Sequence, residues 1–346
     1  MTTIIPNIRQ EHFTGGSKCK GSSEFVKLLN MRLKDTPLLK QTSKPLLWVD
    51  IDDSVLKAFE VICSQKVLSI PVFSTLENKW VSMLDVKDLC AHIVSLFDPK
   101  NQMRTPVPDG YTVRNLLTSN EPGEDLIRNC PIVTQDCTVL ELLNIFNKKI
   151  HRICVSNGPS PMDIKIISEM SLIKWIDQNR EKMGPIFEKT LEEYKLYDPE
   201  KKIISIPNIK LAIDAFRKLK DNNIYGMPIV SETDDELVDS ISVIDIRNAR
   251  LDLARLKQPL SEYFNPSTGK GTSIQRTPII CTPHTRIREA IGKIASTKVH
   301  RIFIIEGLVD GRMNNKPLSV VSVSDIVRVI LTRANEEMGV VGVGSQ

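Results

Sequence analysis

The sequence predicts a mixed α/β protein that is built from four tandem copies of one small unit. The first observation is a set of four similar apolar segments, at residues 68–73, 151–156, 225–230 and 300–305. Aligned on their fourth residues (Pro71, Cys154, Pro228 and Phe303), they follow one another at steps of 83, 74 and 75 residues. The second observation is an amphipathic helix pattern before each segment. Self-similarity at a fixed period is typical of repeat architectures.

Each unit is expected to open with a helix. Apolar residues recur at helical spacing, and an alanine stands thirteen residues before the anchor in three units (Ala58, Ala215 and Ala290). The second unit has the same pattern slipped by about one residue, in Val139, Leu142, Leu143 and Phe146. Ser54, Thr138 and Thr285 are residue types that cap helices, and we expect them near the helix starts.

Two strands and a second helix complete each unit. The anchor segment is the first strand, and residues 79–84, 165–170, 238–243 and 317–323 are the second. A closing helix follows, as in residues 86–97 and 323–333. Such a unit alone would leave a sheet face and two helix stripes uncovered, so we expect the units to pair.

Polar residues recur where the second strand meets the closing helix. Seventeen residues after the anchor stand Asp88, Ser171 and Asp245; Asp325 stands twenty-two residues after its anchor, because the polar loop 307–317 holds five extra residues. Asp85, Ser168, Ser242 and Ser322 lie three residues earlier. A carboxylate in three of four equivalent positions indicates a shared role.

Composition narrows the functional classes. The 346 residues are 41% hydrophobic and 25% charged, with a net charge of +4 and no basic run, which argues against a nucleic-acid partner. No segment has the length or apolar character of a membrane span or a secretory signal. The seven cysteines form no CxxC pair and the five histidines show no ligand spacing, so we expect neither a disulfide framework nor a metal site. No nucleophile motif or Gly-rich phosphate loop is present, and we expect no catalytic residues, no cofactor and no enzymatic activity.

Helix–strand–strand–helix units of this size resemble CBS domains. The [ST]-x-x-D ending of the second strand and the His-Arg pairs before two first strands strengthen the resemblance. Four such repeats over roughly residues 46–334 are similar to the gamma subunit of the AMP-activated protein kinase family, the SNF4 type. The resemblance implies four tandem repeats paired into two Bateman-type modules, one with two and three with four, in a flattened disc.

The resemblance also sets the domain boundaries and the biological role. We expect a flexible N-terminal segment (1–45), repeats at 46–98, 131–180, 203–256 and 278–334, and a flexible tail (335–346). It implies a regulatory subunit in the cytoplasm or the nucleus. Its ligands would be AMP, ADP or ATP, and its partners the catalytic and scaffold subunits of a Ser/Thr kinase, with no nucleic acid and no membrane.

The same resemblance assigns site residues. Asp88, Asp245 and Asp325 would bind ribose hydroxyls, which a carboxylate can accept in pairs, whereas Ser171 cannot do this as well. Ser242, Ser322 and Ser324 would help to orient the sugar or phosphate. The pairs His151/Arg152 and His300/Arg301 would bind phosphate, since arginine offers it a bidentate fork.

Some positions depart from the family pattern. Leu68 stands where a basic residue is usual, with only Lys66 nearby, and Glu169 and Met170 stand where a lysine is usual. Asp85 adds a negative charge in repeat one. These departures weaken the phosphate cluster and the first site, and leave the fourth site best preserved.

Simpler readings compete with these assignments. Ser-x-x-Asp before an apolar helix is also a capping box, and a His-Arg pair at a strand start is often a surface ion-pair partner. Two other functions remain open. One is a CBS scaffold without nucleotide binding, and the other is a sensor of an adenosyl ligand that acts on another enzyme.

Overall fold

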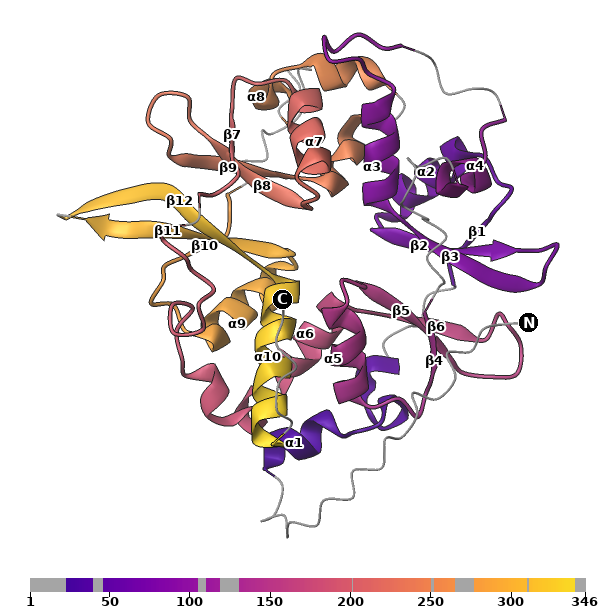
Figure 1. Cartoon of the computed structure of the whole chain (residues 1–346), viewed down its shortest axis with the longest axis vertical. Helices are drawn as coiled ribbons and strands as arrows, with labels where there is room; N and C mark the ends of the chain where they lie inside the picture. Colours follow the sequence, from indigo (N-terminus) through magenta and orange to yellow (C-terminus); the bar gives the residue numbers. More distant parts are fainter. Residues whose placement is uncertain are drawn as a thin grey trace.

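The computed structural model describes residues 23–39, 46–104, 110–118, 131–200, 202–249, 252–264, 277–309 and 311–339. Within these residues the chain forms four three-stranded sheets, each with its own helices (Figure 1). Viewed along the shortest axis, the four units surround a common centre. The mixed α/β class and the four tandem repeats are therefore confirmed.

Each unit contains the expected helix, two strands and closing element. Repeats one and two comprise β1 (Val49–Asp50), α2 (Val55–Gln65), β2 (Ser69–Ser74), β3 (Lys79–Asp85), α3 (Val86–Ser95), β4 (Ile132–Thr134), α5 (Val139–Asn147), β5 (Arg152–Ser156), β6 (Ile164–Ser168) and α6 (Glu169–Gln178). Repeats three and four comprise β7 (Ile206–Pro207), α7 (Ala212–Asp221), β8 (Gly226–Val230), β9 (Leu237–Ser242), a 3₁₀ segment (Val243–Ala249), β10 (Ile280–Cys281), α9 (Ile287–Thr297), β11 (Arg301–Val309), β12 (Arg312–Ser322) and α10 (Val323–Glu337).

The sheets share one topology. A strand of two or three residues precedes the first helix and runs parallel to the anchor strand, which pairs antiparallel with the second strand. The sequence did not predict these short strands. In repeat four the insertion extends the β11–β12 hairpin, whose pairing reaches Val309 and Arg312 (Figure 1).

Capping residues fix most of the helix starts. Ser54 Oγ accepts a hydrogen bond from the Lys57 N–H at 3.2 Å, and Thr138 forms a capping box with Glu141. Thr285 does not cap α9: Arg286 holds the N-cap position, and Thr285 Oγ1 accepts a bond from the Thr282 N–H at 2.9 Å. Thr285 therefore shapes the turn before the helix rather than its first residue.

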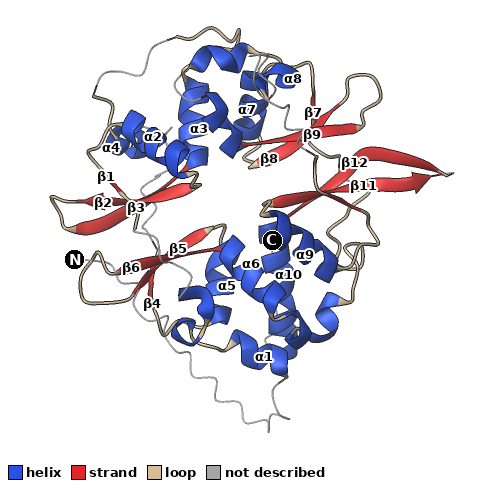
Figure 2. Cartoon of the chain, turned by 180° about the vertical axis from the view of Figure 1, so that it is seen from behind, coloured by secondary structure: helices blue, strands red, loops and turns tan. Residues whose placement is uncertain are grey.

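Sheets join consecutive repeats. Phe73 and Trp80 of repeat one pack against Cys154 and Ile164 of repeat two, and Trp80 Nε1 donates a hydrogen bond to the Pro161 carbonyl at 2.6 Å. On the opposite side β12 lies against β8 and β9. Figures 1 and 2 show both sheet pairs from opposite faces. The expected pairing of one with two and three with four is confirmed.

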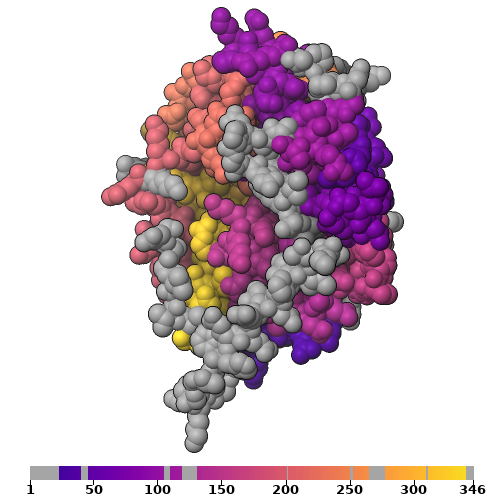
Figure 3. Space-filling view, turned by 45° about the vertical axis from the view of Figure 1, so that its right-hand side comes forward, coloured from indigo at the N-terminus to yellow at the C-terminus, as the bar shows by residue number. Residues whose placement is uncertain are grey.

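Helices join the other pairs of repeats. One hydrophobic core contains residues of repeats one and three, where α3 packs against α7. The other core contains residues of repeats two and four, where α10 packs against α5 and α6 against α9. Figure 3 shows α10 (yellow) beside residues of repeat two (magenta). The four repeats therefore form a closed ring with alternating sheet and helix seams.

Residues 23–39 pack against this ring, although the sequence placed them in a flexible segment. They form α1 (Glu24–Leu29) and two 3₁₀ turns (Leu33–Asp35 and Pro37–Leu39). Their apolar side chains are buried in the core of repeats two and four: Phe25, Leu28, Leu29, Leu33, Leu38 and Leu39. The remainder of 1–45, and residues 340–346 of the predicted tail, lie outside the described residues. Residues 335–337 continue α10.

The connections carry short helices. These are α4 (Val113–Thr118), α8 (Leu260–Tyr263) and the 3₁₀ segments Arg180–Lys182, Gly184–Phe187 and Leu253–Lys257. Tyr263 is fully buried and donates its hydroxyl hydrogen to the Asp245 carbonyl at 2.7 Å, which ties the connection to repeat three. No helix in the described part of the chain combines the length and the apolar character that crossing a membrane requires.

Candidate functional site

The three predicted ribose aspartates lie at the starts of the closing helices. Asp88 Oδ2 accepts a hydrogen bond from the Asp85 N–H at 2.9 Å, and Asp245 Oδ2 accepts one from the Ser242 N–H at 2.7 Å. Asp325 Oδ2 accepts bonds from the N–H and hydroxyl of Ser322, at 2.9 and 2.6 Å. Each aspartate therefore satisfies a backbone donor at a helix N-terminus, as the capping interpretation requires.

Capping occupies one oxygen of each carboxylate in these contacts. Asp325 Oδ1 faces the side chain of Arg328 at 3.2 Å, an ion pair whose arginine is well exposed. In repeat two, Ser171 performs the same capping with its hydroxyl, which bonds to Ser168. Capping therefore needs no carboxylate, and it does not explain why three of the four repeats hold aspartate at this position.

The two predicted His-Arg pairs meet at the centre of the ring. They stand where β5 and β11 begin, so the fold brings residues of repeats two and four together there. Burial, together with the nearby charges of Arg152, Arg301, His151 and Lys174, lowers the pKa of His300 to about 4. His300 is therefore neutral at pH 7. Because the charges of the other three residues act on His300, the two His-Arg pairs lie close together. We call His151, Arg152, His300 and Arg301 the basic cluster.

The arginines of the cluster also contact repeats one and three. Arg152 Nη1 donates a hydrogen bond to Ser69 Oγ at 2.7 Å and lies 3.9 Å from Asp85 Oδ2. Arg301 lies against Gly226, where a side chain would collide with the guanidinium group. Burial lowers the pKa of both arginines, that of Arg301 to about 10; Asp85 and Glu169 oppose the shift of Arg152, and Asp245 that of Arg301. Repeat one and repeat three therefore supply counter-charges.

Glu169 lies inside the cluster, and the sequence did not identify it as a site residue. It is buried at the start of α6; His151 Nδ1 lies 2.8 Å from Oε2, and Ser324 Oγ donates to Oε1 at 3.0 Å. Ser324 is thereby turned toward repeat two. The substitution of an expected lysine by glutamate was visible in the sequence, but its contact across to repeat four was not.

The second ring nitrogen of His151 distinguishes this histidine. Its Nε2 is buried and has no hydrogen-bond partner among the described residues. The ring also stands edge-on to Tyr225 of repeat three, with centroids 4.8 Å apart. A buried polar atom of this kind is normally paired, so this nitrogen can contact a ligand group.

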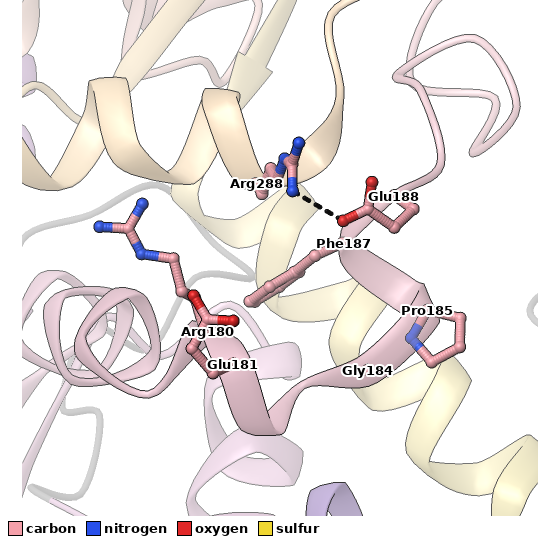
Figure 4. A pocket seen from close by; sticks show the side chains of 7 residues that line it. All are labelled: Arg180, Glu181, Gly184, Pro185, Phe187, Glu188 and Arg288. Carbon is pink, nitrogen blue, oxygen red and sulfur yellow. Dashed lines mark hydrogen bonds and ion pairs between the residues drawn. The ribbon is translucent and has the colours of Figure 1, made fainter.

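A surface hollow lies apart from the cluster. It has a volume of about 330 Å³ and is lined by Arg180, Glu181, Gly184, Pro185, Phe187, Glu188 and Arg288 (Figure 4). Arg288 Nη1 donates to Glu188 Oε1 at 2.8 Å, so its basic group is already paired. None of the predicted site residues lines this hollow. In the described part of the chain, no group of three or more His, Cys, Asp or Glu side chains is arranged to hold a metal ion.

Comparison with known proteins agrees with the repeat architecture. The CBS domain family model matches residues 272–332, which cover repeat four. The chain is 25% identical to protein SDS23 of Yarrowia lipolytica over 333 residues, which cover 85% of this chain and 65% of that protein. It is 28% identical over 131 residues to an SNF1-related protein kinase regulatory subunit gamma-1-like protein of Arabidopsis thaliana, covering 36% of this chain and 28% of that one. The chain spans less than two thirds of the length of these relatives.

A solved structure shares the fold over most of the chain. A protein of Methanocaldococcus jannaschii, proposed to be an archaeal homologue of the gamma subunit of AMP-activated kinase, superposes with a TM-score of 0.62 at 14% sequence identity. The match covers 83% of this chain and 96% of that one. At this identity the comparison establishes a common fold.

Proposed function

We propose that this chain, a four-CBS-repeat protein that resembles the gamma subunits of the AMP-activated kinase family, is a regulatory subunit that binds adenine nucleotides and controls a Ser/Thr kinase. Its action would be regulatory rather than catalytic. AMP, ADP or ATP would bind with phosphates on the central cluster. The resemblance to gamma-like regulatory subunits supports a kinase partner, and the architecture supports the ligand class.

One observation carries the ligand part of the proposal. Four basic residues from repeats two and four, which are not consecutive in the chain, converge at the centre of the ring, and His151 Nε2 is buried there without a partner among the described residues. The two arginines carry the same charge and repel one another, and a bound phosphate relieves that repulsion. Ligand binding to the folded state then stabilises the fold.

The test removes the two arginines of the cluster. We expect AMP to raise the melting temperature of the wild-type protein, and Arg152→Ala with Arg301→Ala to abolish most of that shift, measured by calorimetry with titration of AMP, ADP and ATP. Arg286→Ala with Arg288→Ala is the matched control, because both arginines pair with Glu188 on the surface. The proposal fails if the two double variants respond to nucleotide alike while both remain folded.

A second candidate is a scaffold that assembles partners without nucleotide. The internal carboxylates favour it, since Asp85, Glu169 and Asp245 partly neutralise the cluster in the protein itself. A wild-type protein that binds none of the three nucleotides and still co-purifies with kinase subunits would establish this alternative. Nucleotide binding with co-purification of a different enzyme would instead indicate a sensor outside the kinase family.

A further inference from the structure

Glu169 joins repeats two and four at the basic cluster. Its side chain is only 5% exposed, and both carboxylate oxygens are engaged, by His151 Nδ1 at 2.8 Å and by Ser324 Oγ at 3.0 and 3.2 Å. Its own N–H donates to the His151 carbonyl at 3.1 Å, which fixes the start of α6 beside β5. The position of the carboxylate is therefore set by both backbone and side-chain contacts.

The carboxylate occupies contacts that an external anion would otherwise use. A histidine ring and a serine hydroxyl are typical donors to phosphate oxygen, and here both face Glu169. The charges of Asp85 and Glu169 both act to raise the pKa of the neighbouring Arg152. In a partly buried site a fixed negative charge acts strongly on another at short range.

We propose that Glu169 is a built-in anion that competes with ligand phosphate for the central cluster and makes the site discriminate against highly charged nucleotides. This inference rests on the proposed function and concerns the specificity of the same site. Each added phosphate brings further negative charge toward Glu169. The affinity of the wild-type protein therefore does not increase from AMP through ADP to ATP, and the site favours the ligands with fewer phosphates.

The experiment compares ligands of increasing charge on the full chain. Affinities for adenosine, AMP, ADP and ATP are measured by isothermal titration calorimetry for the wild type, Glu169→Gln and Glu192→Gln. Glutamine retains the shape of Glu169 and removes its charge, and its amide oxygen can accept from Ser324 Oγ as the carboxylate does. Glu192 is the matched control, because it also faces a histidine, His284 at 3.4 Å, but on the exposed surface.

The expected result depends on ligand charge. Glu169→Gln raises the affinity for ATP by about tenfold, an electrostatic change of about 1.4 kcal/mol. It leaves adenosine within about twofold, the range of an uncoupled substitution. Glu192→Gln changes none of the four. A purely structural role of Glu169 would shift all ligands equally, and that result would overturn the inference.

Two further outcomes separate this inference from the proposed function. If the proteins bind nucleotides and Glu169→Gln has no charge-dependent effect, only the role of Glu169 is wrong. If neither the wild type nor the variant binds any adenine compound, the proposed function itself is wrong and the inference falls with it. Should Glu169→Gln fail to fold, the wild-type series alone decides, because affinity that increases with each added phosphate would contradict a built-in anion.

Discussion

His300 shows at the scale of one residue how the fold sets a charge state. Burial and the nearby basic groups lower its pKa to about 4, below the usual histidine value of about 6.5. Between these values the unfolded chain binds a proton that the folded chain does not, so stability falls as the pH falls. Above about pH 6.5 both states are neutral and the dependence disappears.

We predict that His300→Gln removes part of the acid sensitivity of the protein. The free energy of unfolding of the wild type should fall between pH 6.5 and pH 4 by up to about 1.4 kcal/mol per pH unit more than that of the variant. Urea unfolding at several pH values measures this difference. His284→Gln is the control, since His284 is 82% exposed, and it should follow the wild type. Parallel profiles for His300→Gln and the wild type would contradict the prediction.

The sequence predicted the location of a residue correctly where its position in the repeat determines which elements surround it. The aspartate column marked the starts of the closing helices, and the His-Arg pairs marked a point where two repeats meet. It could not foresee the side-chain partners, because Glu169 and Ser324 are 155 residues apart in the chain. The capping function and the ligand function of Asp325 also share one signature, so the sequence alone could not separate them.

At the scale of the element, β8 has a glycine where no side chain fits. A Cβ on Gly226 would lie 2.9 Å from the Ile241 carbonyl oxygen and would overlap the guanidinium group of Arg301. Gly226 therefore lies in close contact with both the β9 backbone and Arg301 of the basic cluster. In α9, by contrast, a Cβ on Gly292 would meet only Asp177 Oδ1, at 3.8 Å.

We predict opposite effects for alanine at these two glycines. Gly292→Ala should raise the free energy of unfolding by about 0.5–1 kcal/mol, the helix-propensity difference between alanine and glycine. Gly226→Ala should lower it by about 1–3 kcal/mol, the scale of overpacking, and displace Arg301. Thermal unfolding and nucleotide titration of both variants provide the measurement. If Gly226→Ala is as stable as the wild type, the close approach of Arg301 does not constrain β8.

Periodicity predicted the longer elements well and the short ones poorly. The opening helices α2, α5, α7 and α9 lie where the apolar pattern placed them. The two-residue strands β1, β7 and β10 carry no pattern that distinguishes them from a loop. The closing element of repeat three is a 3₁₀ segment, Val243–Ala249, because tertiary contacts rather than propensity decide so short a helix.

At the scale of the molecule, neither Bateman-type module has a complete core of its own. The buried residues of repeat one share a core with repeat three, and those of repeat two share one with repeat four. The family resemblance predicted the sheet pairs, but the sequence did not indicate these helix pairs, because every repeat has similar amphipathic helices. The sequence did not predict the packing of residues 23–39 for a related reason. They have no counterpart in the repeat, and only their burial in the core of repeats two and four explains their apolar side chains.

We predict that the chain cannot be divided into independent halves. Residues 1–201 and 202–346, expressed separately, should lack cooperative thermal unfolding, since each would expose the helix faces that the other covers. Expressed together, they should form a complex with the unfolding transition of the whole chain. Gel filtration and circular dichroism distinguish the cases. Two separately folded, monomeric halves would contradict the prediction.

The closed ring has a mechanical consequence. Four repeats joined in a closed loop at four seams are mechanically coupled, as in a four-bar linkage, because a rotation at one seam changes the geometry at the others. A change of angle at the sheet seam between repeats one and two must therefore be matched at the opposite seam, where β12 lies on β8 and β9. The side chains at the centre of the ring, among them His151 against Tyr225, lie where all four repeats converge. A partner bound across the sheet seam of one repeat pair would therefore be displaced by a movement at the sheet seam of the other pair.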